Sequence, residues 1–252
     1  MDLTFIIILL ASIGSGIHWN LAANNKSSLV SLIIVLCTFF LVTYQVYIRG
    51  QAAQQCPINS VQELLIFISW SILLFYLVIG KIYRLSFLGL LTLPAVALFE
   101  VLGLIPSLQM AFPSAQRAIN PILEWHVFLL LLAYGALGQA ALAGVLFLQL
   151  HRVLKKSNFS NRLFSQMPPI GRLSEAIKRL LWLGFSLLTI GIILGFKLDY
   201  AADSFKFYLA CGTWVSYFVL IIVDKIRGLP LKLMSIYVLA LYILNLILLV
   251  SI

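Results

Sequence analysis

Charged side chains are scarce in this sequence: aspartate, glutamate, lysine and arginine together make up 10% of its 252 residues. A soluble domain carries about 25% charged residues, so too few remain here to cover a water-soluble globule of this size. Apolar residues make up 62% of the chain. They come in blocks of roughly 20, about the length at which an α-helix crosses a hydrocarbon core. The composition therefore excludes a soluble fold and predicts a multi-spanning membrane protein.

The motifs of soluble enzymes are also missing. No Walker loop, dinucleotide-binding glycine pattern, HExxH or G-x-S-x-G motif occurs in the sequence. The three cysteines, Cys37, Cys56 and Cys211, have no metal-ligand spacing, and we interpret them as packed or free thiols. The candidates for chemistry that remain are the histidines and the polar side chains at membrane depth, which are costly in lipid.

Eight apolar segments are each predicted to form a transmembrane helix. They are Leu3–Ile17, Leu29–Tyr47, Gln62–Gly80, Leu85–Ile105, His126–Leu150, Leu180–Lys197, Lys206–Val223 and Leu233–Ile252. The first is short, and Asp2 stands where a signal peptide would carry positive charge, so we expect this segment to be retained. No internal repeat or low-complexity tail is evident, and residues 1–252 are predicted to form one domain.

The distribution of basic residues predicts the orientation of this all-α bundle. If both termini lie on the outer, periplasmic side, 13 of the 17 lysines and arginines fall on the inner side, as the positive-inside rule requires. The longest inner loop, Arg152–Arg179, holds seven of them and is expected to attract anionic lipid headgroups. The net charge of +9 is then a consequence of topology, and no nucleic-acid partner is expected.

His126 is the foremost candidate site residue. It stands at the outer end of the fifth predicted helix, next to Trp125, and neutral imidazole is a common ligand of metals and of haem. Tyr134 lies about two turns deeper on roughly the same face. Small residues between Gly135 and Gly144 would let a neighbouring helix or a flat macrocycle approach closely. The alternative interpretation is an interfacial histidine beside a membrane-belt tryptophan.

Two carboxylates lie near the outer ends of predicted helices. Glu63 opens the third helix, where the helix dipole favours a negative charge. Glu100 lies within an apolar stretch of the fourth helix, where an ionised carboxylate is costly unless it is paired. We expect Glu100 either to find a partner, such as Arg117, or to reach water. In the sixth helix, Gly191-x-x-x-Gly195 is typical of close helix packing.

Three blocks of sequence occur in an order and spacing shared with one family. The first is Ser60–Trp70, the second is the histidine-led stretch His126–Tyr134, and the third is Pro168-Pro169 with the following run Gly184–Gly195. Over Pro57–Trp214 these blocks together resemble the cytochrome c assembly proteins of the CcsA/ResC type.

The resemblance is incomplete on the outer side. Haem-handling members of that family carry a tryptophan-rich segment ending in Trp-Asp-Pro-Lys, whereas Asp203-Ser204-Phe205 precedes Lys206 here. No histidine follows His151, so the later histidines of the family are missing. The pattern is more similar to the HemX/YpjD-like branch of shorter, eight-helix inner-membrane proteins.

The resemblance implies a non-catalytic, haem-associated protein of the bacterial inner membrane, acting in cytochrome c assembly or haem homeostasis. His126 would be the axial ligand to the haem metal, because it alone maps onto a haem-ligand position of the family. Trp125 and Tyr134 would line the haem pocket, Lys206 would meet a propionate, and Glu63 would orient the outer loops. The expected partners are the lipid bilayer and a membrane protein of an assembly complex.

Two other functions remain open. The chain could be a cofactor-free structural or regulatory subunit that keeps the fold and docks a membrane partner through the Gly191–Gly195 face and the basic inner loop. It could also be a transporter that uses Glu100, although transporter sites usually lie on broken helices and only Pro94 interrupts a predicted span. A Soret band would distinguish the haem hypothesis from both.

Overall fold

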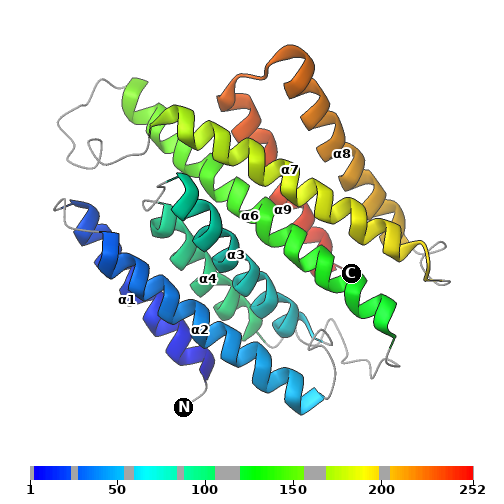
Figure 1. The fold of residues 1–252 in the computed structure, drawn as a ribbon, viewed down its shortest axis with the longest axis horizontal. Helices are drawn as coiled ribbons and strands as arrows, with labels where there is room; N and C mark the ends of the chain where they lie inside the picture. The colour runs from blue at the N-terminus through cyan, green and yellow to red at the C-terminus, as the bar shows by residue number, and fades with distance from the viewer. Residues whose placement is uncertain are drawn as a thin grey trace.

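The computed structural model describes residues 3–23, 28–53, 60–83, 88–105, 120–155, 169–198 and 205–251. Within these ranges the protein is all-helical and contains no strand (Figure 1). The helices are α1 (Leu3–Ala23), α2 (Ser28–Ala53), α3 (Val61–Tyr83), α4 (Gly89–Gly103), α6 (Pro121–Lys155), α7 (Ile170–Gly195), α8 (Phe205–Arg227) and α9 (Leu231–Ser251).

Each of the eight predicted segments corresponds to one observed helix, so the all-α class is confirmed. Five of the helices in the described ranges (α2, α3, α6, α7 and α8) are long and apolar enough to cross a membrane. The other three, α1, α4 and α9, are shorter apolar helices. The chain is therefore a multi-pass membrane protein.

Helix α6 is longer than the predicted span His126–Leu150 and contains 35 residues. It begins at Pro121, since proline is favoured at a first helical position where its missing N–H is not needed. Asn120 precedes it and accepts the backbone N–H of Ile122 through Oδ1 at 3.0 Å, which caps the helix. This early start places His126 in the second turn of α6, with a full turn of helix before it.

Helix α7 begins at Ile170, ten residues before the predicted span Leu180–Lys197. The sequence predicts that Arg172–Arg179 belongs to the inner loop, as a juxtamembrane helix leading into this span, and in the structure it is part of the same continuous helix. It continues because an apolar stripe, which includes the fully buried Leu173 and Ile177, packs against the rest of the bundle. Helix α7 thus runs without a break from the basic loop to Gly195.

The helices alternate in direction, so the starts of α1, α3, α6 and α8 meet the ends of α2, α4, α7 and α9 at one end of the bundle (Figure 1). We call this the His126 end. Described basic residues concentrate toward the opposite end: Arg152, Lys155, Arg172, Lys178, Arg179, Lys225, Arg227 and Lys232. There, Lys178 Nζ lies 2.8 Å from Asp224 Oδ2 and ties α7 to α8.

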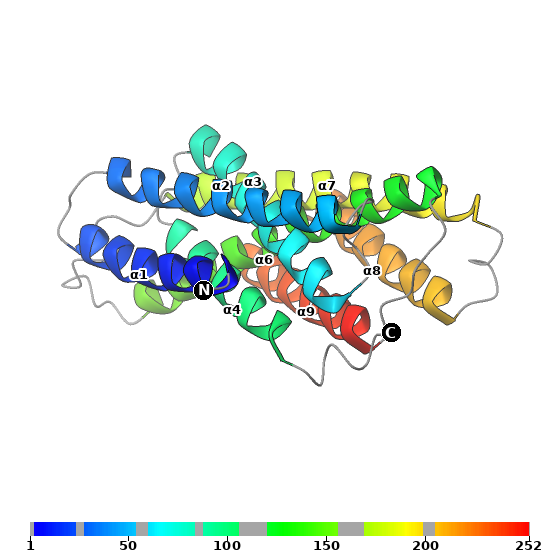
Figure 2. The same cartoon turned by 90° about the horizontal axis from the view of Figure 1, so that it is seen from below.

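The first four helices and the last four have the same order of neighbours. In each half, successive helices pack together and the first also packs against the fourth, as α1 does against α4 and α6 against α9. The halves are joined mainly where α3 packs on α6. Seen from below, α2 and α7 run along one side of the bundle, while α4 and α9 lie on the other (Figure 2).

A three-residue contact links α2 to α3 in the N-terminal half. Thr43 donates its hydroxyl to the Phe39 carbonyl at 2.7 Å and accepts the indole N–H of Trp70 at 3.0 Å. The Trp70 ring stacks on Phe39 with centroids 6.0 Å apart and an interplanar angle of 24°. We call this arrangement the Phe-Thr-Trp motif.

The Phe-Thr-Trp motif recurs between α7 and α8. Thr189 donates to the Phe185 carbonyl at 2.8 Å and accepts the indole N–H of Trp214 at 2.8 Å. Trp214 stacks on Phe185 at 5.5 Å and 27°. The motif and the shared order of neighbours make the bundle a repeat of two four-helix halves. The sequence shows no run of identity that reveals this repeat, because the shared residues are isolated positions on separate helices.

Candidate functional site

The imidazole of His126 is held by the backbone of α7. Its Nδ1 lies 2.7 Å from the carbonyl oxygen of Gly191. A carbonyl oxygen can only accept a hydrogen bond, so Nδ1 carries the proton and donates it. In the neutral ring Nε2 then keeps its lone pair, which is the arrangement that metal-ligating histidines adopt.

Glycines on α7 make room for this ring. A Cβ atom on Gly195 would lie 2.8 Å from Cε1 of His126, and one on Gly191 would lie 2.7 Å from Cδ2 of Leu130. Real Cβ contacts are not this short, so only glycine lets the two helices approach so closely at these positions. The Gly191-x-x-x-Gly195 motif is therefore an internal contact with α6, and the hypothesis that this face docks a partner is wrong.

Trp125 and Tyr134 lie on other faces of α6. The Trp125 side chain is 60% exposed, and its ring meets Phe128 edge-on at 5.7 Å. The Tyr134 hydroxyl donates to the backbone carbonyl of Asn245 on α9 at 3.4 Å. Within the described structure, no hydrogen bond or ring contact joins either side chain to His126.

Glu63 belongs to a capping box at the start of α3. The Ser60 backbone N–H donates to Glu63 Oε2, and the Glu63 backbone N–H donates to Ser60 Oγ, both at 3.2 Å. The sequence pattern Ser-x-x-Glu before an apolar run signals this contact. One turn later Phe67 meets Phe128 of α6 with centroids 5.7 Å apart, so the capped end of α3 lies beside the start of α6.

Two residues named by the sequence analysis fall outside what can be placed. Lys206 belongs to the first turn of α8, at the His126 end, but its side chain is outside the described residues. Arg117 also lies outside them.

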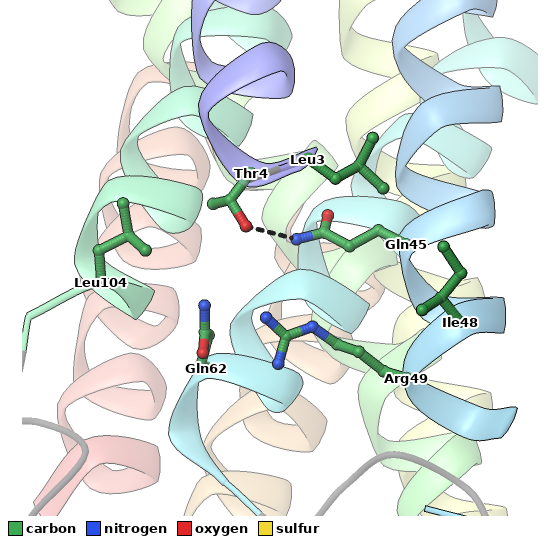
Figure 3. Close-up of a pocket in the computed structure, with 7 residues that line it drawn as sticks. All are labelled: Leu3, Thr4, Gln45, Ile48, Arg49, Gln62 and Leu104. Carbon is green, nitrogen blue, oxygen red and sulfur yellow. Dashed lines mark hydrogen bonds between the residues drawn. The ribbon is translucent and has the colours of Figure 1, made fainter. Parts of the chain in front are cut away.

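Glu100 is paired with Gln45, a residue that the sequence analysis missed. Its side chain is 1% exposed, and its Oε2 accepts from Gln45 Nε2 of α2 at 3.3 Å. The same Nε2 donates to Thr4 Oγ1 of α1 at 3.0 Å (Figure 3). An isolated glutamine in the apolar stretch of α2 is the signal that could have found this partner, because amides at membrane depth need one.

The other buried amides pair between helices of the interior. Gln139 of α6 donates to Thr92 of α4 at 3.1 Å, and Asn245 of α9 donates to the Tyr217 hydroxyl of α8 at 3.3 Å. No group of three or more His, Cys, Asp or Glu side chains that could hold a bare metal ion occurs among the residues placed by the structure. A single imidazole such as that of His126 suits a metal that brings most of its own ligands, as haem iron does.

Comparisons with known proteins identify a family and several relatives of this chain. Residues 58–251 match the family described as Cytochrome C assembly protein, and α1 and α2 precede this region. The cytochrome c biogenesis protein CcsA of Mesostigma viride is 24% identical over 221 residues, covering 76% of this chain and 70% of that protein. CcsA of a Prochlorococcus marinus strain is 26% identical, covering 68% and 62%. Protein HemX of Bacillus subtilis is 22% identical, covering 81% and 72%.

Proposed function

This chain belongs to the cytochrome C assembly protein family, and from that premise we propose that it handles haem during cytochrome c biogenesis. It would bind haem without catalysing a covalent step of its own. The relatives named for cytochrome c biogenesis support this role, and the chain spans about two thirds of their length. The observation that carries the proposal is the His126–Gly191 hydrogen bond. Because Nδ1 donates the proton of the neutral ring in this bond, Nε2 keeps a lone pair with which it can bind a metal.

In this proposal each site residue has one task. His126 would hold the iron through Nε2, and haem would supply the redox-active metal. Trp125 and Tyr134 would contribute aromatic surface to the haem pocket from neighbouring faces of α6, without touching the histidine itself. Lys206 offers an ammonium group to a propionate at the same end of the bundle. Glu63 fixes, through its capping box, the angle at which the preceding loop enters α3.

We further propose that residues 1–252 form one domain whose eight helices all cross the membrane, with both termini on the periplasmic side of a bacterial inner membrane. Support comes from the basic residues at the end opposite His126, since the positive end of a membrane protein faces the cytoplasm. The site would then open toward the periplasmic side. Its partner would be another membrane protein of cytochrome c assembly.

The visible spectrum of the detergent-purified protein tests the haem proposal, recorded as isolated and after haem is added. We expect a Soret band in the wild type that is lost in His126→Ala. His151→Ala is the matched control, because His151 lies on the same helix at the opposite end and stacks on Phe147. The control should keep the band.

A wild-type spectrum without a Soret band after haem addition would contradict the proposal and favour the cofactor-free subunit. A band that survives in His126→Ala would show that the iron ligand is another residue.

A further inference from the structure

A pocket of about 530 Å³ opens at the His126 end of the N-terminal half, between α1, α2, α3 and the end of α4 (Figure 3). We call it the Arg49 pocket. It is lined by Leu3, Thr4, Gln45, Ile48, Arg49, Gln62 and Leu104. One cation, two amides and a hydroxyl thus share the lining with three aliphatic side chains. Such a lining suits a polar headgroup attached to an apolar chain.

The polar groups of the Arg49 pocket have unused hydrogen-bonding capacity. The Arg49 guanidinium reaches into the pocket (Figure 3), and no carboxylate of a described residue lies within 4.0 Å of it. Gln45 is 3% exposed, and its Oε1 has no partner among the described residues. Behind it, Oε1 of Glu100 also has none. The Glu100 carboxyl interacts electrostatically with Arg49 from a greater distance. The guanidinium is therefore free to form a direct ion pair with an anion in the pocket, and the buried acceptors need a donor.

The repeat places the Arg49 pocket where the other half has the His126 site. Gln45 follows the threonine of the first Phe-Thr-Trp motif by two residues, as Gly191 follows that of the second. The first helix of each half supplies the group bonded there: Thr4 in α1 and His126 in α6. One turn beyond Gln45 stands Arg49, where α7 has a glycine. Both halves thus hold polar side chains at the same level of the bundle.

We propose that the Arg49 pocket binds the headgroup of an aminophospholipid, a phosphate ester that carries an ammonium group. The phosphate meets the Arg49 guanidinium, whose planar fork matches phosphate oxygens. The ammonium donates to Gln45 Oε1, with the Glu100 carboxylate behind it. The acyl chains leave past Leu3 and Ile48, and Ile48 is 44% exposed on the surface of the bundle. A free phosphate ester with an amino group shares this headgroup chemistry.

Native mass spectrometry of the detergent-purified full chain tests this assignment without any added haem, so its failure is separate from failure of the haem proposal. The probes are phosphatidylethanolamine, phosphatidylcholine and free phosphoethanolamine. Phosphatidylethanolamine should be retained about tenfold better than phosphatidylcholine, whose quaternary ammonium has no N–H to donate. Free phosphoethanolamine should bind more weakly than the lipid, because it lacks the chains.

Variants connect the preference to the pocket. Arg49→Gln should reduce phosphatidylethanolamine retention to the phosphatidylcholine level. Arg227→Gln, an exposed arginine at the opposite end, should leave it unchanged. Gln45→Met keeps the side-chain length but removes the amide acceptor, and it should abolish the preference between the two lipids. This second variant keeps the test decisive if Arg49→Gln fails to fold.

Equal retention of the two lipids by the wild type would overturn the assignment, as would a preference unaffected by both variants. Arg49-dependent binding of phosphoethanolamine at a level equal to that of the lipid would support the headgroup chemistry and identify a free zwitterion as its source.

Discussion

The His126 imidazole is positioned by two residues that have no side chain: Gly191, whose carbonyl accepts its hydrogen bond, and Gly195, where an added Cβ atom would lie 2.8 Å from Cε1 of the ring. The sequence predicts the histidine, since its position at a helix end and its resemblance to a family ligand are both readable. It does not predict the acceptor. A backbone carbonyl leaves no signature in a residue pattern, and only the packing of α6 on α7 brings it within reach.

Gly195→Ala should disturb the site without removing any ligand atom. The added Cβ would lie 2.8 Å from His126 Cε1, so the ring must move and the bond to Gly191 is strained or lost. Loss of such a supporting contact typically costs about 10–100-fold in metal affinity. Haem titration followed at the Soret band measures this change.

The matched control is Gly212→Ala on α8, where a Cβ atom would meet nothing within 4 Å. Equal haem affinities for Gly195→Ala and the wild type would show that haem binding by His126 does not depend on the close approach of Gly195 to the ring.

Ser60→Ala should destabilise the start of α3, because the capping box loses the hydroxyl that accepts the Glu63 N–H. Loss of such a cap costs about 1 kcal/mol. Glu63→Gln should be nearly neutral, since glutamine can also close a capping box. Thermal unfolding of both variants in detergent measures the difference, and a larger loss in Glu63→Gln would mean that the carboxylate charge has a further task.

At the scale of helices, the sequence predicts the number and approximate limits of the elements but not their contacts. Apolar runs identify each helix because every span must be apolar whatever it packs against. The choice of neighbours depends on small residues facing large ones, as when a Cβ on Gly184 would lie 2.7 Å from Cγ of Leu137. At Arg172–Arg179 the prediction of the helix limits fails. The charges of this stretch suggest an inner loop, although one of its faces is apolar and buried in α7.

Trp70→Phe and Trp214→Phe should have matching effects if the two halves are structural repeats. Each variant keeps an aromatic ring on the stacked phenylalanine and removes one indole hydrogen bond to threonine. Each should lower the free energy of unfolding by ~1 kcal/mol.

The double variant should lose the sum of the two effects, since well-separated sites are additive. Unfolding monitored by tryptophan fluorescence or circular dichroism measures all three variants. A large loss in one half with none in the other would contradict equivalent roles for the two motifs.

At the scale of the whole molecule, the described helices alternate in direction and are even in number, so the start of α1 and the end of α9 lie at the same end of the bundle. The unequal distribution of basic residues between the two ends supports the proposed orientation in the membrane. The sequence predicts this asymmetry directly from its lysines and arginines. The sequence does not predict that four helices pack in the same order in each half, because this order is a property of contacts between distant segments.

Cysteine labelling in intact bacterial cells tests the direction. In a chain whose three native cysteines are replaced by serine, Gln51→Cys lies at the His126 end on α2, and Lys155→Cys lies at the opposite end on α6. Both positions are exposed. A membrane-impermeant maleimide should label Gln51→Cys in intact cells and Lys155→Cys only after the inner membrane is permeabilised. The reverse pattern would place the His126 end in the cytoplasm.

The acceptor of the His126 proton has a consequence for how this site can evolve. The oxygen belongs to the peptide group of residue 191, so no side chain there supplies it. A substitution at that position would act on the bond only through the helix spacing, since a Cβ atom on Gly191 would lie 2.7 Å from Cδ2 of Leu130 on α6. The tautomer of the His126 ring therefore depends on the distance and tilt between α6 and α7, and not on the identity of a neighbouring side chain. Selection can adjust the histidine only by remodelling the backbone interface, so the histidine and the helix pair must change together.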